Sequence, residues 1–347
     1  MRLLGRASLF LACTSHDADV ARALVPAVSR RVSTHAHGCD TSSKASAGAT
    51  SSHPTTWGAG KLSLIASCLI ALLLPAAALA AAPQRIVSAA PSITETLFAL
   101  GLGDQVVGVT QYCHYPPEAL KKPKIGGYMR QSLETIVALR PDLVIAERSP
   151  SNLDSQLARL KIASLEVNFS TLADIIASMQ KIAGAAGVPE RGRALTSSIS
   201  SQLEAIRNRV KNDPRPKLMF VVGRTPGTLT GLIVVGGKSY LSELIDIGGG
   251  VNTFADATAP YPKVAMEEVL ARDPDVIVDR ADMGDQGGAT EAQRRAVLDL
   301  WRTYPALKAS KLGRVFAVDS DIFVAPGPRI VDAAKAFADM LHPERKP

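Results

Sequence analysis

The stretch Leu133-Glu-Thr-Ile-Val-Ala-Leu-Arg-Pro-Asp-Leu-Val-Ile145 decides the fold, because the chain contains it twice. The second copy is Met266-Glu-Glu-Val-Leu-Ala-Arg-Asp-Pro-Asp-Val-Ile-Val278, which aligns without a gap. Each copy has the pattern of a short helix, a turn at Pro-Asp and a buried strand of aliphatic residues. The repeat therefore predicts two similarly built lobes.

Strands alternate with helices on both sides of each copy, which is typical of parallel sheets covered by helices. The predicted strands are 85–90, 106–110, 143–146, 164–167, 217–222, 276–279 and 314–318. The predicted helices begin at 92, 133, 152, 239, 266 and 330. Ser92 and Glu95 predict a capping box at the first of these helices. The fold class is α/β, with two Rossmann-like lobes and mostly parallel sheets.

One long helix is expected between the two lobes. Apolar residues in 189–212 recur every three or four positions, at Leu195, Ile199, Leu203, Ile206 and Val210. A helix of about 24 residues is about 36 Å long. We therefore expect an N-terminal lobe at 84–187, a rigid linking helix at 188–213 and a C-terminal lobe at 214–347.

An export signal is expected before the first lobe. Lys61 precedes an apolar run that ends in Ala78-Leu79-Ala80, so residues 61–80 have the pattern of a cleaved signal peptide. A retained membrane anchor is the alternative, although Pro75 interrupts the run. Lipoprotein anchoring at Cys68 is not expected, because the apolar run follows that cysteine. Residues 1–60 are polar and aperiodic, and we interpret them as a disordered or mis-annotated extension.

Charge and cysteine usage exclude several function classes. The chain has 39 Lys and Arg and 32 Asp and Glu residues, and residues 1–82 hold seven and three of them. The remainder is nearly balanced, which gives no support for nucleic-acid binding. Only Cys113, His114 and His342 remain as cysteine or histidine beyond residue 82, too few for a disulfide framework or a bare zinc or manganese receptor.

An enzyme or a scaffold without a small ligand is the alternative of a different class. The chain after residue 82 has no G-x-S-x-G, H-E-x-x-H or Walker motif. Cys113 and His114 are adjacent, whereas a catalytic dyad comes from distant positions. Asp142 and Asp275 follow prolines and are interpreted as turn formers. We therefore expect no enzymatic activity.

The sequence resembles the class III periplasmic substrate-binding proteins of ABC importers, the family that serves vitamin B12, ferric siderophores and haem. The matching stretches are RIVSAAPSITETLFALGLGDQVVGV, YPPEALKKPKIGG, SLETIVALRPDLVIA, ELIDIGGGVNTFAD, YPKVAMEEVLARDPDVIV and PGPRIVDAAKAFADML. The resemblance implies a monomeric periplasmic receptor without a cofactor, which delivers its ligand to a membrane permease and its ATPase.

The resemblance also implies where the receptor docks. One acidic residue on each lobe of these proteins meets arginines of the permease, and the match places these residues at Glu134 and Glu267, with Glu268 as a neighbouring contender. A simpler explanation for both glutamates exists, since an acidic residue in the first turn of a helix interacts favourably with the helix dipole.

The match is nearest to the vitamin-B12 branch, so a corrinoid is the expected ligand. The ligand-binding residues implied by the match are Pro91, Tyr112, Tyr115, Tyr128, Arg130, Tyr261, Asp321 and Phe323. Glu147 and Ala325 replace a Trp and an Arg of that branch. In the haem alternative, Gly127-Tyr128-Met129-Arg130 supplies a tyrosinate ligand, and the Arg130 guanidinium would lower the pKa of Tyr128. A ferric siderophore is the third alternative.

Overall fold

The computed structural model describes residues 82–128, 130–148, 152–280 and 289–345. The predicted signal peptide, the extension before it and Met129 lie outside these ranges. Residues Ala76–Pro347 belong to one compact unit. No helix within the described ranges combines the length and the apolar character needed to cross a bilayer.

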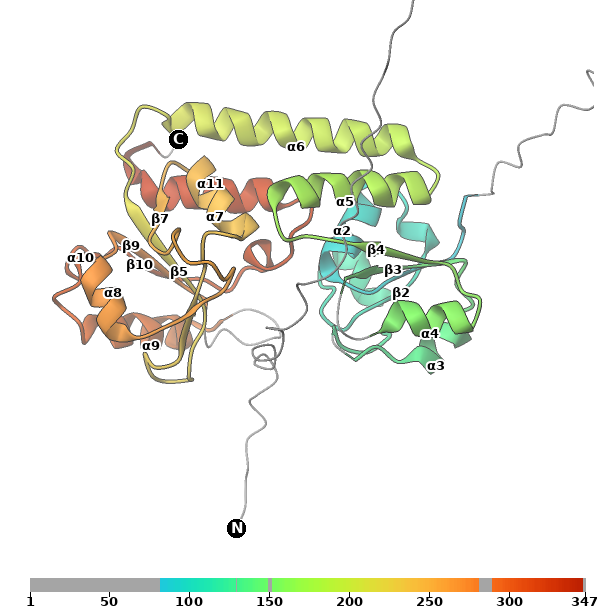
Figure 1. Ribbon diagram of the computed structural model, residues 1–347, viewed down its shortest axis with the longest axis horizontal. Coiled ribbons are helices and arrows are strands. Elements are labelled where there is room, and N and C mark those ends of the chain that lie inside the picture. The colour runs from blue at the N-terminus through green and yellow to red at the C-terminus, as the bar shows by residue number, and fades with distance from the viewer. Residues whose placement is uncertain (1–81, 129, 149–151, 281–288, 346–347) are drawn as a thin grey trace, which may run out of the picture. The chain divides into compact units, whose positions relative to one another are not determined.

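The first lobe is built on a parallel sheet in the order β2-β1-β3-β4 (Figure 1). Its elements are β1 (Ile86–Ser88), α2 (Pro91–Ala99), β2 (Val106–Val109), α3 (Leu133–Ala138), β3 (Leu143–Glu147), α4 (Leu153–Arg159), β4 (Ser164–Val167) and α5 (Leu172–Ala185), with 3₁₀ turns η1 (Gly103–Gln105) and η2 (Pro117–Lys121). Ile86 and Ile145 share a core with α2 and α5, whereas Val87 and Val144 share one with α3 and α4. Successive side chains on a strand point to opposite faces, so helices cover both faces of this sheet.

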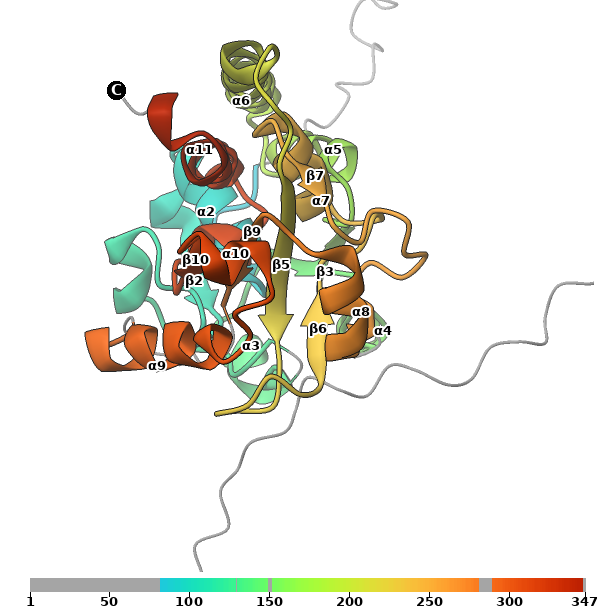
Figure 2. The ribbon, with the colours of Figure 1, turned by 90° about the vertical axis from the view of Figure 1, so that its left-hand side faces the viewer.

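The second lobe has a mixed sheet in the order β10-β9-β5-β6-β8, with β7 paired to β5. Its elements are β5 (Lys217–Gly223), β6 (Leu232–Val234), α7 (Tyr240–Ile247), β7 (Val251–Asn252), β8 (Lys263–Val264), α8 (Met266–Arg272), β9 (Val276–Asp279), α9 (Glu291–Arg302), α10 (Lys308–Lys311), β10 (Val315–Ala317), α11 (Ile330–Leu341) and the 3₁₀ turns η3 (Asp321–Phe323) and η4 (Pro343–Arg345). The strands β9 and β10 are parallel to β5, while β6 runs antiparallel to β5 and β8 (Figure 2).

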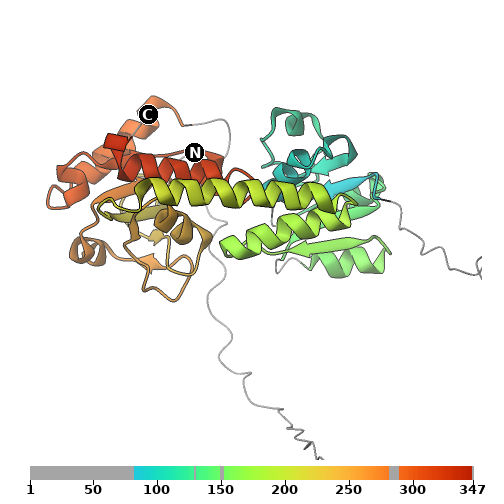
Figure 3. The ribbon, with the colours of Figure 1, turned by 90° about the horizontal axis from the view of Figure 1, so that it is seen from above.

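The predicted long helix is present as α6 (Pro189–Val210). It packs against α5 of the first lobe and against α7 and α11 of the second (Figure 3). Ile199 and Leu203, two of the residues in its predicted apolar stripe, are buried. The chain therefore passes from one lobe to the other through a continuous helix.

The internal repeat extends to backbone geometry. Arg140 and Asp273, equivalent in the two copies, both have a left-handed backbone, with φ of 46° and 45°. The equivalent carboxylates act alike: Asp142 accepts from the backbone N–H of Arg85 at 3.1 Å, and Asp275 accepts from that of Lys217 at 2.8 Å. Both aspartates, interpreted from the sequence as turn formers, thus bond to the backbone at the start of a neighbouring strand.

One local prediction was wrong. The first helix starts at Pro91 with Ala90 as its N-cap, so the predicted capping box of Ser92 and Glu95 does not form. Pro91 has no N–H to lose at the first helical position, which lets the helix begin one residue earlier. Helix α5 was not predicted from the sequence, although it has a capping box between Thr171 and Asp174.

Candidate functional site

Tyr128 lies on a tight loop between η2 and α3. A bridge between Gly126 and Gln131 closes this loop, and the Gly127 N–H donates to the Arg130 carbonyl at 3.1 Å. Gly126 has a φ of 105°, and a Cβ there would lie 2.6 Å from the Arg130 oxygen. The loop therefore depends on glycine, and it holds Tyr128 partly buried against the first-lobe core.

The Tyr128 hydroxyl donates a hydrogen bond of 2.5 Å to Oε2 of Glu147, the last residue of β3. Burial raises the pKa of Tyr128 far above its usual value, and the Glu147 carboxylate raises it further. The expected lowering by Arg130 does not occur, since Arg130 is exposed and makes no ion pair within the described ranges. Burial also raises the pKa of Glu147, although the hydrogen bond from Tyr128 acts to lower it.

The charge of the same carboxylate also influences Tyr261, a residue of the second lobe. It lies in the loop before β8, where the Val234 N–H donates to the Pro262 carbonyl at 3.0 Å. Although 42% of Tyr261 is exposed, nearby protein desolvates its phenol and, with Glu147, raises its pKa to about 12. Tyr261 also contributes to the raised pKa of Tyr128. The Glu147 carboxylate thus influences the pKa of one tyrosine from each lobe and accepts a hydrogen bond from Tyr128.

Tyr115 and Asp321 take part in a contact between the lobes. The Arg329 guanidinium lies 4.1 Å from the centre of the Tyr115 ring, and His114 Nδ1 lies 3.6 Å from Asp321 Oδ2. Arg329 also forms a bidentate ion pair with the buried Glu95 carboxylate. We call Glu95, His114, Tyr115, Asp321 and Arg329 the clasp. Pro91 at the start of α2 and Tyr112 on the loop after β2 are partly exposed.

Phe323, one of the predicted ligand-binding residues, is buried in this structure. It is 2% exposed and packs against Phe220 and Phe337, with ring centres 5.4 and 5.2 Å away. Its carbonyl oxygen accepts from the Tyr240 hydroxyl at 2.9 Å. Phe323 is therefore a core residue of the second lobe, and Ala325, at 2% exposure, is buried as well.

Comparison with known proteins identifies the family. The sequence pattern of the family described as periplasmic binding protein matches residues 86–322. The chain belongs to this family. A vitamin B12-binding protein of Vibrio parahaemolyticus is 31% identical over 255 residues, which are 72% of this chain and 86% of that relative.

Solved structures of this family have the same two-lobed fold. The periplasmic vitamin B12-binding protein of Vibrio cholerae has a TM-score of 0.63 and 28% identity, over 76% of this chain and 99% of that one. The periplasmic haem-binding protein of Roseiflexus sp. RS-1 has a TM-score of 0.63 and 28% identity, over 74% of this chain and 99% of that one. The family and fold expected from the sequence are confirmed, and relatives of similar identity bind different tetrapyrroles.

The two predicted docking residues of this periplasmic binding protein have matched positions. Glu134 and Glu267 are each the second residue of their helices, α3 and α8. Both are exposed, and neither forms an ion pair with a described residue. Glu268, the neighbouring candidate for docking, forms an ion pair with Arg272 at 3.0 Å. Glu134 and Glu267 are therefore free to meet a partner, and their docking role stays a prediction.

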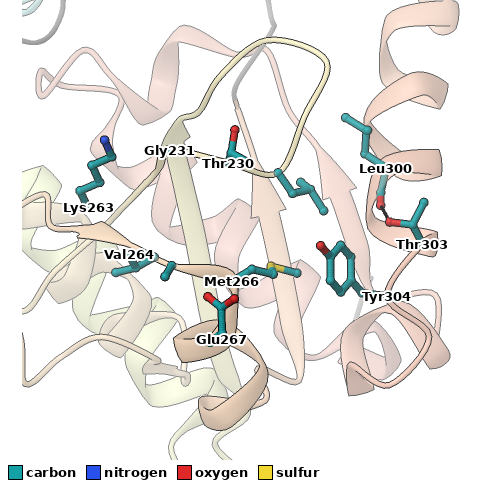
Figure 4. Close-up of a pocket in the computed structure, with 11 residues that line it drawn as sticks. Thr230, Gly231, Lys263, Val264, Met266, Glu267, Leu300, Thr303 and Tyr304 are labelled. Carbon is teal, nitrogen blue, oxygen red and sulfur yellow. Dashed lines mark hydrogen bonds between the residues drawn. The ribbon is translucent and has the colours of Figure 1, made fainter.

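A groove of about 630 Å³ lies beside Glu267 on the second lobe. Glu267 projects from the first turn of α8 at its edge, and Met266, Leu300 and Tyr304 contribute to its walls (Figure 4). Neither Tyr128 nor Tyr261 lines it, and all of its lining residues belong to the second lobe.

The Cys113-His114 pair has no catalytic geometry. The Cys113 thiol is buried beside the hydroxyls of Thr94 and Thr110, each 3.2 Å away, and its burial raises its pKa. His114 instead contacts Asp321, and the described part of the chain holds no cluster of three metal-ligating side chains. Sequence patterns also missed Glu95, Glu147 and Arg329, whose roles depend on partners in distant segments.

Proposed function

We propose that this chain is a periplasmic receptor that binds a corrinoid between its lobes. The proposal is carried by Tyr128, which is hydrogen-bonded to Glu147 in the first lobe, together with Tyr261 of the second lobe, whose pKa the charge of the same carboxylate raises. A large planar macrocycle is held mainly by aromatic and apolar surface, with a few polar groups that orient it. The 31% identity to a vitamin B12-binding protein supports the same ligand class.

Haem is the second candidate, because a haem-binding relative is 28% identical. Ligation of haem iron by Tyr128 would need the phenolate form. Burial and the neighbouring Glu147 carboxylate both raise the pKa of Tyr128 and so oppose that form. The environment of Tyr128 favours a neutral phenol, which suits contact with a corrin ring better than ligation of iron.

Delivery to an ABC importer completes the proposal. The predicted signal peptide at 61–80 would export the chain to the periplasm, where Glu134 and Glu267 would dock onto arginines of the permease. Release of the ligand would then need the energy of the importer's ATPase. The receptor itself makes and breaks no covalent bond in this proposal.

Absorption titration of the purified protein with cyanocobalamin and, separately, with hemin tests the proposed ligand. We expect tight one-to-one binding of cyanocobalamin, confirmed by calorimetry, and a weak response to hemin. A tyrosinate-type haem spectrum that disappears in Tyr128→Phe would instead establish the haem alternative. Binding of neither ligand would refute the tetrapyrrole assignment and leave a siderophore to be tested.

A further inference from the structure

Two oppositely charged residues occupy equivalent positions in the two lobes. Continuing the repeat by two residues beyond Ile145 and Val278 aligns Glu147 with Arg280. Glu147 ends β3, and Arg280 directly follows β9. Both therefore lie at the carboxyl end of a parallel strand, the edge at which α/β sheets bind their ligands. The first lobe contributes an acidic residue there, and the second lobe contributes a basic one.

Glu147 retains the capacity to accept a further hydrogen bond. Its Oε2 accepts from Tyr128, while its Oε1 accepts none from the described residues. The residue is partly buried, so water alone does not fully solvate the carboxylate. A partly buried acceptor of this kind is stabilised by an N–H or O–H donor of the ligand.

The side chain of Arg280 also has an unused capacity for hydrogen bonding. Its backbone N–H donates to the Val221 carbonyl at 3.0 Å, which fixes the residue at the end of the strand. Its side-chain Nε is buried without a hydrogen-bond partner among the described residues, and the guanidinium forms no ion pair with any of them. An unpaired buried donor costs stability unless a ligand supplies an acceptor.

The strand ends that carry these two residues lead to a contact between the lobes. The backbone N–H of Tyr240, the first residue of α7, donates to the Ser170 carbonyl at 2.9 Å. Ser170 lies three residues after Val167, which pairs with Glu147 in the first sheet. The charges of Glu147 and Arg280 also influence the pKa of Tyr240. Both residues therefore lie at the side of their lobe that faces the other lobe.

We propose that Glu147 and Arg280 select the ligand by its peripheral groups: Arg280 binds a phosphodiester, and Glu147 accepts from an amide N–H. This inference rests on the proposed corrinoid function and narrows it to corrinoids that carry a nucleotide loop. Cobalamin has one phosphodiester and a rim of amide side chains. Haem has two carboxylates and no peripheral N–H. The Glu147 carboxylate would therefore face a like charge where it needs a hydrogen-bond donor.

The contribution of Arg280 is tested with cyanocobalamin and with dicyanocobinamide, which lacks the phosphodiester. We expect Arg280→Met to weaken cyanocobalamin binding about 10- to 100-fold, the usual effect of losing a hydrogen bond to a charged group, and to change dicyanocobinamide binding less than threefold. Arg280→Lys should retain part of the preference. The exposed Arg159→Met, in α4 of the first lobe, is the matched control and should bind both ligands like the wild type.

The contribution of Glu147 is tested with hemin. Glu147→Gln keeps an oxygen that can accept from Tyr128 but removes the charge, so we expect hemin to bind at least threefold more tightly and cyanocobalamin more weakly. Equal losses for cobalamin and cobinamide in Arg280→Met, or wild-type affinities in both variants, would overturn the inference while the corrinoid function stands. Failure of the wild type to bind cyanocobalamin would overturn both.

Discussion

Arg329, just before α11, forms an ion pair with Glu95 in α2 through two of its nitrogens. Nε lies 2.9 Å from Oε2, and Nη2 contacts Oε1. Glu95 is 3% exposed, and burial raises its pKa although Arg329 opposes that rise. The two residues are 234 positions apart. The pair therefore joins the two lobes at a point where water contributes little.

Removing only Arg329 should destabilise the protein strongly. Arg329→Met leaves the Glu95 carboxylate buried without its partner, which typically costs about 3–5 kcal/mol. The double variant Glu95→Leu with Arg329→Met removes both charges and should recover most of that loss. Urea unfolding at pH 7.5 measures all of these free energies. If the double variant is as unstable as Arg329→Met, the loss comes from packing and not from the unpaired charge.

Local sequence patterns identify this clasp poorly. Ser92 and Glu95 have the spacing of a capping box, and that spacing suggested a local role for Glu95. The structure instead pairs Glu95 with Arg329, because the fold brings distant segments together. In the same way Phe323 matched a ligand-contacting segment, although it completes a core cluster with Phe220 and Phe337.

Patterns that depend on burial were more informative. The strands at 164–167 and 276–279 and the helix at 330–341 were predicted with their observed bounds, because apolar runs and turn signals delimit them. The antiparallel strands β6 and β8 were missed, since each is only two or three residues long. Pairing direction depends on the partner strand, which a short segment does not specify.

Glu147→Gln should stabilise the folded protein at neutral pH. Burial raises the pKa of Glu147, so between the unfolded and folded pKa values the folded state holds more protons than the unfolded chain. The free energy of unfolding of the wild type therefore falls as pH rises through that window. Glutamine does not titrate, so the variant should be more stable than the wild type at pH 7 and should have a higher Tm.

The pH dependence distinguishes this charge effect from a change in packing. Below about pH 4 the wild-type carboxyl is protonated in both states, so the advantage of the glutamine should disappear. Glu95 titrates in both proteins, and its effect cancels in the difference. Thermal melts from pH 3.5 to 8 measure the trend, and an advantage that stays constant over this range would contradict it.

The two tyrosines should respond differently to substitution. Tyr261→Ala removes an aromatic face from the second lobe and should weaken cyanocobalamin binding about tenfold, in line with the energy of an aromatic contact. Tyr128→Phe keeps the ring and should bind within threefold of the wild type. Leu312→Ala, at a residue 63% exposed in the second lobe, is the control. Calorimetry gives the affinities, and a larger loss in Tyr128→Phe than in Tyr261→Ala would argue for a role of the phenol oxygen.

Charge reversal at the matched helix starts separates docking from ligand binding. Glu134 and Glu267 are exposed second residues of equivalent helices, so an arginine there changes the surface charge without disturbing the core. Glu134→Arg and Glu267→Arg should each lower ligand uptake in cells more than tenfold, because two like charges would face one another at the permease.

The soluble affinity of both docking variants should equal that of the wild type, since both glutamates are exposed and neither forms a hydrogen bond or ion pair with a described residue. Glu204→Arg, an exposed residue of α6, is the matched control and should support normal uptake. Uptake of labelled cobalamin and calorimetry on the purified proteins give the two readouts. Normal uptake by both variants, or a loss of soluble affinity in both, would show that these glutamates do not form the docking contact.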